Sequence, residues 1–145
     1  MDLAEFLRNS GYRRIVLARS GVGHFHAQGM LNEHPVSILL DTGGSNPIVN
    51  LPTLQKFNLA AGKLPHQGGG AGAARMDIYR VPDAMLRLED TVARASALLA
   101  MDLSHVNDAL ARKGPAPIDI VVGVDVFEAQ SAITDYPGSS LFLMP

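Results

Sequence analysis

The chain has 145 residues, of which 47% are apolar, so it can bury one hydrophobic core but is too short for two well-packed domains. Its 12 Lys and Arg and 14 Asp and Glu residues leave a formal net charge of −2 without long runs of either sign, which argues against nucleic acid as a partner. The lack of cysteine excludes disulfides, thiolate metal sites and a cysteine nucleophile. We therefore expect residues 1–145 to form a single domain.

The N-terminal stretch predicts a short helix and no targeting segment. Leu3, Phe6 and Leu7 lie at positions i, i+3 and i+4, and Gly11 can end the helix. No basic segment followed by an apolar core is present here, and the chain nowhere contains about 18 uninterrupted apolar residues. We expect residues 1–12 to be a helical extension of a soluble, cytoplasmic protein with no membrane partner, unless the sequence has been trimmed.

Short β-rich segments separated by turn signals follow. Residues 15–18, 24–31 and 36–40 are rich in strand formers, with Ser-Gly-Val-Gly and Asn-Glu-His-Pro between them. Neighbouring strands of this kind pair in antiparallel fashion. The last one runs directly into Asp41-Thr42-Gly43-Gly44-Ser45, so a buried strand delivers a carboxylate to a glycine-rich turn.

The middle of the chain predicts a short helix and a hairpin. In residues 51–57, a proline near the start and apolar residues on one face predict two helical turns. The segment Gly68-Gly69-Gly70-Ala71-Gly72 has no large side chain, and residues 76–81 alternate between apolar and polar types. This pattern predicts a mobile hairpin tip with a strand returning from it, and a disordered surface loop is the alternative.

Residues 85–110 fit either strands or a helix, because a helical stripe also runs through them. The stripe consists of Val92, Ser96, Leu99, Leu103, Val106 and Leu110. The C-terminal part is less ambiguous: residues 118–122 predict an apolar strand, Gly123 ends it, and residues 125–128 predict one helical turn. Residues 132–135 and 141–143 then predict a closing hairpin in a compact, mostly β, barrel-like domain.

Two blocks of the sequence, in this order, resemble the single-domain retropepsin-like aspartic peptidases, a family with many bacterial members that is related to the retroviral proteases. The first block is residues 32–45, a strand that leads into Asp-Thr-Gly. The second is residues 120–127, with the Val122-Gly123 pair, a short helix and closing strands behind it. Asp-Thr-Gly alone is a weak signal, but two blocks about 80 residues apart in the family's order make chance a poor explanation.

The resemblance implies a mainly β fold: a closed β-barrel of the retropepsin or acid-protease type, with one or two short helices and a flap hairpin. By the same resemblance, Gly68, Gly69, Gly70, Ala71 and Gly72 form the substrate-covering flap. It favours a strand over residues 92–102 and a helix over residues 105–113, against one continuous helix.

The resemblance also makes Asp41 the catalytic carboxylate of an aspartic endopeptidase. Peptide hydrolysis without a metal or covalent nucleophile needs an activated water and an acid. Two close carboxylates can share one proton and divide these tasks, and the chain has a single Asp-Thr-Gly, so the second carboxylate must come from a homodimer. We expect a peptide or protein substrate, acidic or mildly acidic working pH, and neither metal nor cofactor.

The remaining site residues receive positional roles from the resemblance. Thr42 braces the two loops, Gly43 allows close approach, and Ser45 completes the loop. Gly44 departs from the alanine that is common after the motif, which raises the question of loop rigidity. Val122 and Gly123 support the site, and a side chain at Gly123 would collide with the active-site loop.

Other interpretations stay open. His24 and His26 alternate along one strand face, but without a nearby third ligand they are expected to be ordinary strand histidines. The fold without catalysis, as a peptide-binding or scaffold dimer, is the alternative function, and the chain could also be a piece of a longer protein. Four further aspartates are expected on solvated turns or faces: Asp102, Asp108, Asp119 and Asp125.

Overall fold

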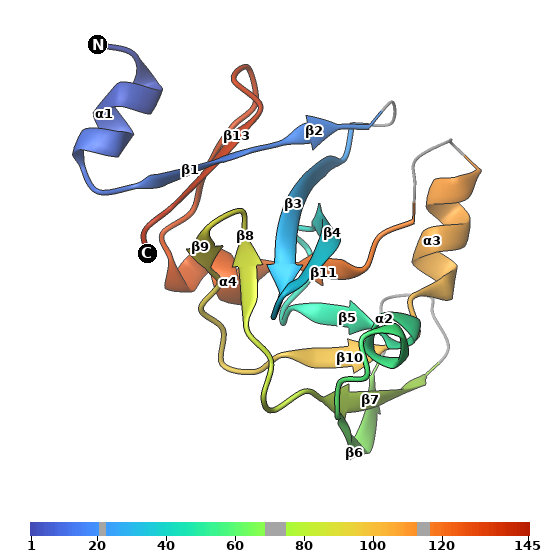
Figure 1. The fold of residues 1–145 in the computed structure, drawn as a ribbon. Helices are drawn as coiled ribbons and strands as arrows, with labels where there is room; N and C mark the ends of the chain where they lie inside the picture. Colours follow the sequence, from blue (N-terminus) through green and yellow to red (C-terminus); the bar gives the residue numbers. More distant parts are fainter. Residues whose placement is uncertain (21–22, 69–74, 113–116) are drawn as a thin grey trace.

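The computed structural model describes residues 1–20, 23–68, 75–112 and 117–145. Strands are the predominant regular structure, and short helices pack at the periphery (Figure 1). The N-terminal helix and the small sheet that carries the C-terminus lie at one end of the molecule, and the β6–β7 hairpin lies at the other.

Four short helices occur in the described residues, more than the one or two expected for the barrel. They are α1 (Leu3–Asn9), α2 (Leu51–Lys56), α3 (Ser104–Ala111) and α4 (Val124–Ala129). Asp2 caps α1, because its carboxylate accepts the Glu5 N–H at 2.8 Å, and Pro52 occupies the first turn of α2. Each helix coincides with a segment that the sequence indicated, so the predicted number was wrong and the positions were right. No helix of the described segments has the length and apolar character needed to cross a membrane.

The strands divide between two sheets. The small sheet has the order β1-β13-β12 and is antiparallel, and the large sheet has the order β6-β7-β10-β5-β11-β4-β3-β8-β9, with β2 added to β3. The strands are β1 (Arg13–Val16), β2 (Ala18–Arg19), β3 (Phe25–Leu31), β4 (His34–Leu40), β5 (Ile48–Asn50), β6 (Gly62–Gly68), β7 (Met76–Arg80), β8 (Leu86–Leu88), β9 (Thr91–Val92), β10 (Leu99–Met101), β11 (Ile120–Val122), β12 (Ile133–Asp135) and β13 (Ser140–Leu143).

These pairings confirm a mainly β fold with the predicted β3–β4 and β12–β13 hairpins. Within the described ranges, the order of the large sheet is open, with β6 and β9 at its two ends. Closure of this sheet into a barrel therefore stays a prediction.

The central strands β4 and β11 are covered on both faces, which explains their apolar sequences. Ile38, Ile120 and Val122 are buried in the larger core cluster, whereas the alternate residues Leu39 and Val121 face a smaller cluster beside α3. Successive side chains of a strand point to opposite faces, so a strand between two apolar layers needs an almost unbroken apolar run.

The predicted strand over residues 92–102 is wrong, and so is the continuous helix that competed with it. Only the two ends of this range lie in strands, β9 and β10. Between them, side chains from the α4 region hold the backbone: the Arg94 N–H donates to Gln130 Oε1 at 2.7 Å, and the Ser96 N–H donates to Asp125 Oδ2 at 3.0 Å. These bonds replace strand pairing, because a side-chain acceptor satisfies a backbone donor equally well.

The predicted strand over residues 15–18 is divided between the two sheets. Its first part belongs to β1 in the small sheet and its last residue to β2 in the large sheet. Leu17 lies between them, and its N–H donates to the Ser139 carbonyl at 2.9 Å. The chain therefore crosses from one sheet to the other at this residue.

Candidate active site

Asp41 follows the end of β4, next to the end of β11. The two strands are parallel, with Leu40 opposite Val122, and the Asp41 N–H donates to the Val122 carbonyl at 2.9 Å. Because parallel neighbours end at the same edge of a sheet, the loop after β4 meets the start of α4 there. The structure thus brings the two blocks of the sequence together.

The loop holds the Asp41 carboxylate in a tight turn. The Gly43 N–H donates to Asp41 Oδ1 at 2.9 Å, and the Gly44 N–H donates to the Asp41 carbonyl at 3.1 Å. Asp41, Thr42, Gly43 and Ser45 are exposed, whereas Gly44 is half-buried. The carboxylate is therefore oriented by its own loop and accessible from outside the chain.

Gly43 and Thr42 have room around them within this chain. A Cβ on Gly43 would lie 3.4 Å from Asp41 Oδ1, which is an ordinary contact. The Thr42 hydroxyl has no hydrogen-bond partner within the described ranges. The described residues therefore give no reason for glycine at position 43 or for the Thr42 hydroxyl.

Gly123, in contrast, packs directly against the backbone of the Asp41 loop. A Cβ at this buried position would lie 2.3 Å from the Gly44 oxygen and 3.0 Å from the Asp41 oxygen, so a side chain would collide with the loop. The first residues of α4 add two bonds: the Val124 N–H donates to the Gly44 carbonyl at 2.8 Å, and the Asp125 N–H donates to the Ser45 carbonyl at 2.9 Å. These contacts hold the loop in place. They do so even though the loop has Gly44 where alanine is common in the family.

Two aspartates that were expected on solvated faces are half-buried and hydrogen-bonded, so that prediction is wrong for them. Asp125 Oδ2 accepts bonds from Asn46 Nδ2 at 3.1 Å and from Ser96 Oγ at 2.9 Å. Asp119 Oδ2 accepts the Ser37 N–H at 2.9 Å, next to the start of β11. Both carboxylates tie neighbouring segments together because buried backbone and amide donors there need acceptors. Asp102 and Asp108 are exposed, as expected.

Asp41 lies in a hollow of about 480 Å³. Its loop forms one side, and apolar side chains from the strands and from the segment before α3 form much of the rest. The apolar part of the lining consists of Ile48, Ile78, Leu99, Met101, Leu103, Val106 and Val121. The carboxylate therefore faces a cavity with a largely apolar wall and few polar groups, which is typical of a ligand site.

The β6–β7 hairpin and α3 provide two further walls. His66 and Gly68 of β6 and His105 of α3 line the hollow. Gly68 packs tightly, since a Cβ there would lie 2.3 Å from Ile78 Cδ1. The other predicted flap residues, Gly69, Gly70, Ala71 and Gly72, lie outside the described residues, so the flap stays a prediction.

The two histidines were not among the site residues predicted from the sequence. His66 and Gly68 are two residues apart on one strand, and so share a face. This two-residue spacing was visible in the sequence and could have been used to predict that His66 lies beside the predicted flap residue Gly68. His105 had no comparable signal, because only the fold brings α3 to the hollow.

The described residues contain no group of three or more His, Asp or Glu side chains placed to hold a metal ion. His24 and His26 are adjacent on one face of the β3 region, and burial, together with the nearby His24, lowers the pKa of the His26 imidazole. Its Nε2 atom is buried without a hydrogen-bond partner in the described part of the chain.

The comparison with protein families agrees with the site geometry. Residues 27–126 match the model of the family described as "Aspartyl protease", which covers more than half of the chain. The chain belongs to this aspartyl protease family. The match includes most of β3, the Asp41 loop, the β6–β7 hairpin, β11 and the start of α4.

Solved structures place this aspartyl protease chain in the retropepsin-like fold. A retropepsin-like aspartic protease from Rickettsia conorii is similar with a TM-score of 0.59 and 15% identity, over 91% of this chain and 90% of that one. The retroviral protease-like domain of Ddi1 from Leishmania major has a TM-score of 0.54 and 16% identity, over 81% of this chain and 86% of that one. No curated protein matches the chain in sequence. The aspartic peptidase family and the retropepsin-like fold predicted from the sequence are thus confirmed, and the family supports a protease-type function.

Proposed function

We propose that the protein is an aspartic endopeptidase in which a water molecule is activated between two Asp41 carboxylates of a homodimer. The observation that carries the proposal is the position of Asp41: an accessible carboxylate, held by its own loop, in the hollow beside the β6–β7 hairpin. Each chain contributes one such loop, so a two-fold axis beside it would bring two identical carboxylates together.

The proposed reaction begins with one proton shared between the two carboxyl groups. The ionised Asp41 takes a proton from the water while the water oxygen bonds to the carbonyl carbon of the peptide. The protonated Asp41 of the partner subunit gives its proton to the carbonyl oxygen. The tetrahedral diol then returns a hydroxyl proton to one carboxylate while the other protonates the leaving nitrogen. The C–N bond breaks, and the shared proton is restored.

The shape of the hollow suits an extended peptide. The edge strand β6 borders it, and an extended chain can bond to such an edge while alternate side chains enter the cavity. Its apolar wall, with Ile78 and Met101, would accept apolar side chains next to the bond that is cleaved. We therefore expect substrates with large apolar residues at this bond.

The decisive experiment compares cleavage of a peptide library by the wild type and by Asp41→Asn. The amide cannot exchange the proton, so we expect kcat/KM to fall by at least about a hundredfold, the usual contribution of a positioned acid or base. Because Asp41 is exposed, the variant should keep the unfolding midpoint of the wild type. Equal cleavage by both proteins would remove the proposal.

A peptide-binding scaffold of the same fold is the second candidate. Gly44 motivates it, since alanine would fit there: a Cβ would lie 3.5 Å from the Asp41 oxygens. A compound that mimics the tetrahedral intermediate should bind an enzyme far more tightly than a matched substrate peptide binds. Equal affinity for the two compounds, together with no cleavage, would favour the scaffold.

A further inference from the structure

In the part of the Asp41 hollow that the structure describes, polar groups are few, and three of them can change charge. These are Asp41, His66 and His105. No Lys or Arg belongs to the part of the lining that the structure describes. Any positive charge that the described lining presents to a bound peptide must therefore come from the two imidazoles.

The two histidines come from different walls of the hollow. His66 lies on β6 of the hairpin, and His105 lies in the first turn of α3, which begins at Ser104. Both side chains are exposed to solvent. Both histidines therefore border the hollow that contains Asp41.

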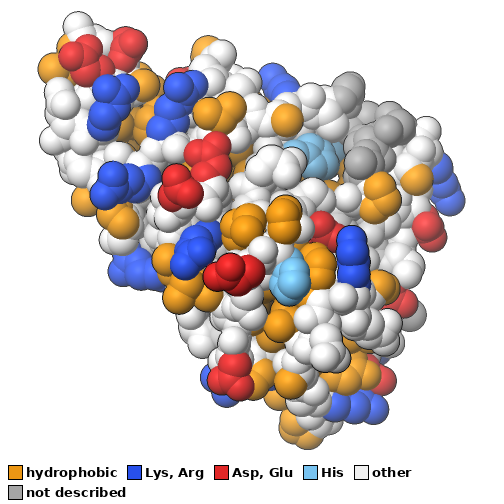
Figure 2. Space-filling view, in the orientation of Figure 1, with side chains coloured by type: hydrophobic (Ala, Val, Ile, Leu, Met, Phe, Trp, Pro, Cys, Tyr) orange, Lys and Arg blue, Asp and Glu red, His pale blue; other side chains and the backbone are white. Residues whose placement is uncertain are grey.

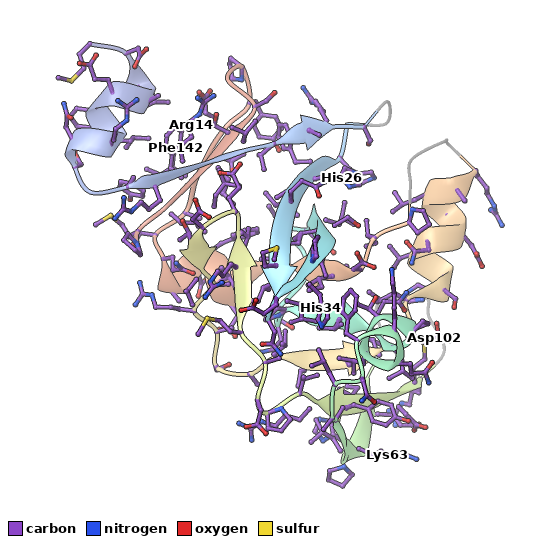
Figure 3. The ribbon with its side chains drawn as sticks, in the orientation of Figure 1. Arg14, His26, His34, Lys63, Asp102 and Phe142 are labelled. Atoms are coloured by element: carbon purple, nitrogen blue, oxygen red, sulfur yellow. The ribbon has the colours of Figure 1, made fainter. Side chains whose placement is uncertain are left out.

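The charged neighbours of His66 neutralise one another. Asp77 of β7 accepts a bond from Gln67 Nε2 at 3.0 Å, and its other oxygen pairs with Lys63 Nζ at 3.3 Å. Figure 3 shows Lys63 on the hairpin at the end of the molecule remote from α1. A proton on His66 would therefore add a net positive charge beside the hollow.

His105 has acidic neighbours on its own side of the hollow. Asp102 precedes α3 (Figure 3), and its carboxylate accepts the Ser104 N–H at 2.8 Å and the Ser104 hydroxyl. Asp108 is one turn further along the helix. These carboxylates offset part of the charge that a protonated His105 would add, so His66 should have the larger effect on a bound anion.

We propose that His66 and His105 determine the substrate class: peptides in which an acidic side chain accompanies the apolar residue at the cleaved bond. This proposal rests on the proposed peptidase function and deepens it. The apolar wall binds one side chain of the substrate, and an imidazolium pairs with a neighbouring Glu or Asp. Histidine gains its charge in the mildly acidic range, where a carboxyl pair that shares one proton also works.

The selectivity follows from charge pairing at an exposed site. An exposed ion pair contributes little, so a Glu peptide should exceed its Gln twin in kcat/KM by about fivefold at mildly acidic pH. When the imidazoles lose their protons, the remaining charge of the site is the negative Asp41 pair, which repels Glu. The preference should therefore vanish or reverse above neutral pH.

The test uses pairs of peptides that share an apolar residue at the cleaved bond and differ only by Glu or Gln at each neighbouring position. Cleavage is measured from about pH 5 to about pH 8 for the wild type, His66→Gln, His105→Gln and the double variant. His34→Gln is the matched control, because His34 stacks on Phe57 with ring centroids 4.2 Å apart and does not line the hollow.

The expected result is a Glu preference at low pH that decreases in His66→Gln, decreases less in His105→Gln and is lost in the double variant. The preference for Glu over Gln and the cleavage of both peptides should change little in His34→Gln. A Glu preference that survives in the double variant, or no Glu preference in the wild type, would overturn the proposal while leaving the peptidase intact.

A binding arm separates the two proposals. The affinity of Asp41→Asn for the same Glu and Gln peptides is measured with and without the double His→Gln change. A histidine-dependent Glu preference in binding, with no cleavage by the wild type, would support the histidine role and overturn the peptidase. No binding and no cleavage of any peptide would overturn both.

Discussion

At the scale of single residues, Gly123 carries the clearest steric requirement near Asp41. In Gly123→Ala the new Cβ would lie 2.3 Å from the Gly44 oxygen and 2.6 Å from the Gly44 carbon, and backbone atoms cannot move aside as a flexible side chain can. We expect a loss of about 2 kcal/mol in the free energy of unfolding, the usual cost of overpacking, with a lower kcat because the Asp41 loop shifts. Urea unfolding and peptide cleavage measure the two effects.

Gly62→Ala is the matched control for this substitution. Gly62 lies in β6, and a Cβ there has no neighbour within 4 Å. Its unfolding free energy should stay within about 0.5 kcal/mol of the wild type, as at most surface positions. If Gly123→Ala were as stable and active as Gly62→Ala, tight packing of Gly123 against the loop would not matter for the site.

The sequence identified residues whose role depends on local pattern and missed those whose role depends on contacts across the chain. Asp41 stood out because an apolar strand led into a glycine-rich turn. Asp119 and Asp125 looked like ordinary polar residues near turns, yet they bond to Ser37 and Ser96, which are distant in sequence. A single sequence does not show such partners, because nothing in the residue type indicates which remote donor it meets.

At the scale of elements, Asp102 is hydrogen-bonded to Ser104, the first residue of α3. The Ser104 hydroxyl and then the Ser104 N–H, both donating to the carboxylate, hold the pKa of Asp102 below its usual value. A carboxyl whose pKa is lower in the folded state stabilises the fold above its unfolded-state pKa of roughly 4, and this stabilisation is lost as the pH falls through the folded-state value. We expect Asp102→Ala to cost about 0.5 kcal/mol near neutral pH, with the deficit shrinking in acid.

Urea unfolding of both proteins from about pH 6 to about pH 3 measures this deficit. Asp108→Ala serves as the comparison, since Asp108 is exposed on the same helix and alanine favours helix formation. It should not lower the unfolding free energy. A deficit in Asp102→Ala that persists unchanged at the acidic end would show that the carboxylate does not stabilise α3.

Elements with a regular spacing of apolar residues could be predicted from the sequence. Segments whose backbone is held by side-chain hydrogen bonds could not. β3 buries every second residue and β11 buries all of its residues, so the apolar patterns of these strands reflect their buried faces. Residues 93–98 carry a helical stripe but form neither helix nor strand, because Gln130 and Asp125 accept their backbone N–H groups. The order of residues alone does not show whether local helix propensity or such remote hydrogen bonds decide the conformation.

At the scale of the whole molecule, the Asp41 loop lies where the parallel strands β4 and β11 end, and its carboxylate is exposed. Acidic and basic side chains are interspersed on the face shown in Figure 2, without a large region of one sign. An assembly of two copies through this face would therefore not be driven by attraction between large charged regions. The proposed mechanism needs such an assembly, because one chain supplies one carboxylate.

Mixing wild-type and Asp41→Asn chains tests whether two copies share one site. If subunits exchange freely, an equimolar mixture places about half of the wild-type chains in mixed dimers, which hold a single carboxylate. We expect the activity per wild-type chain to fall to about half, and to fall further with excess Asp41→Asn, whereas added Gly62→Ala chains, which keep Asp41, should raise the total activity in proportion to all the chains present. Activity that stays proportional to the wild-type chains alone, under conditions where exchange is verified with labelled subunits, would mean that a single chain holds a complete site. A carboxyl outside the Asp41 loop would then have to supply the second acid, and the symmetric mechanism would be wrong.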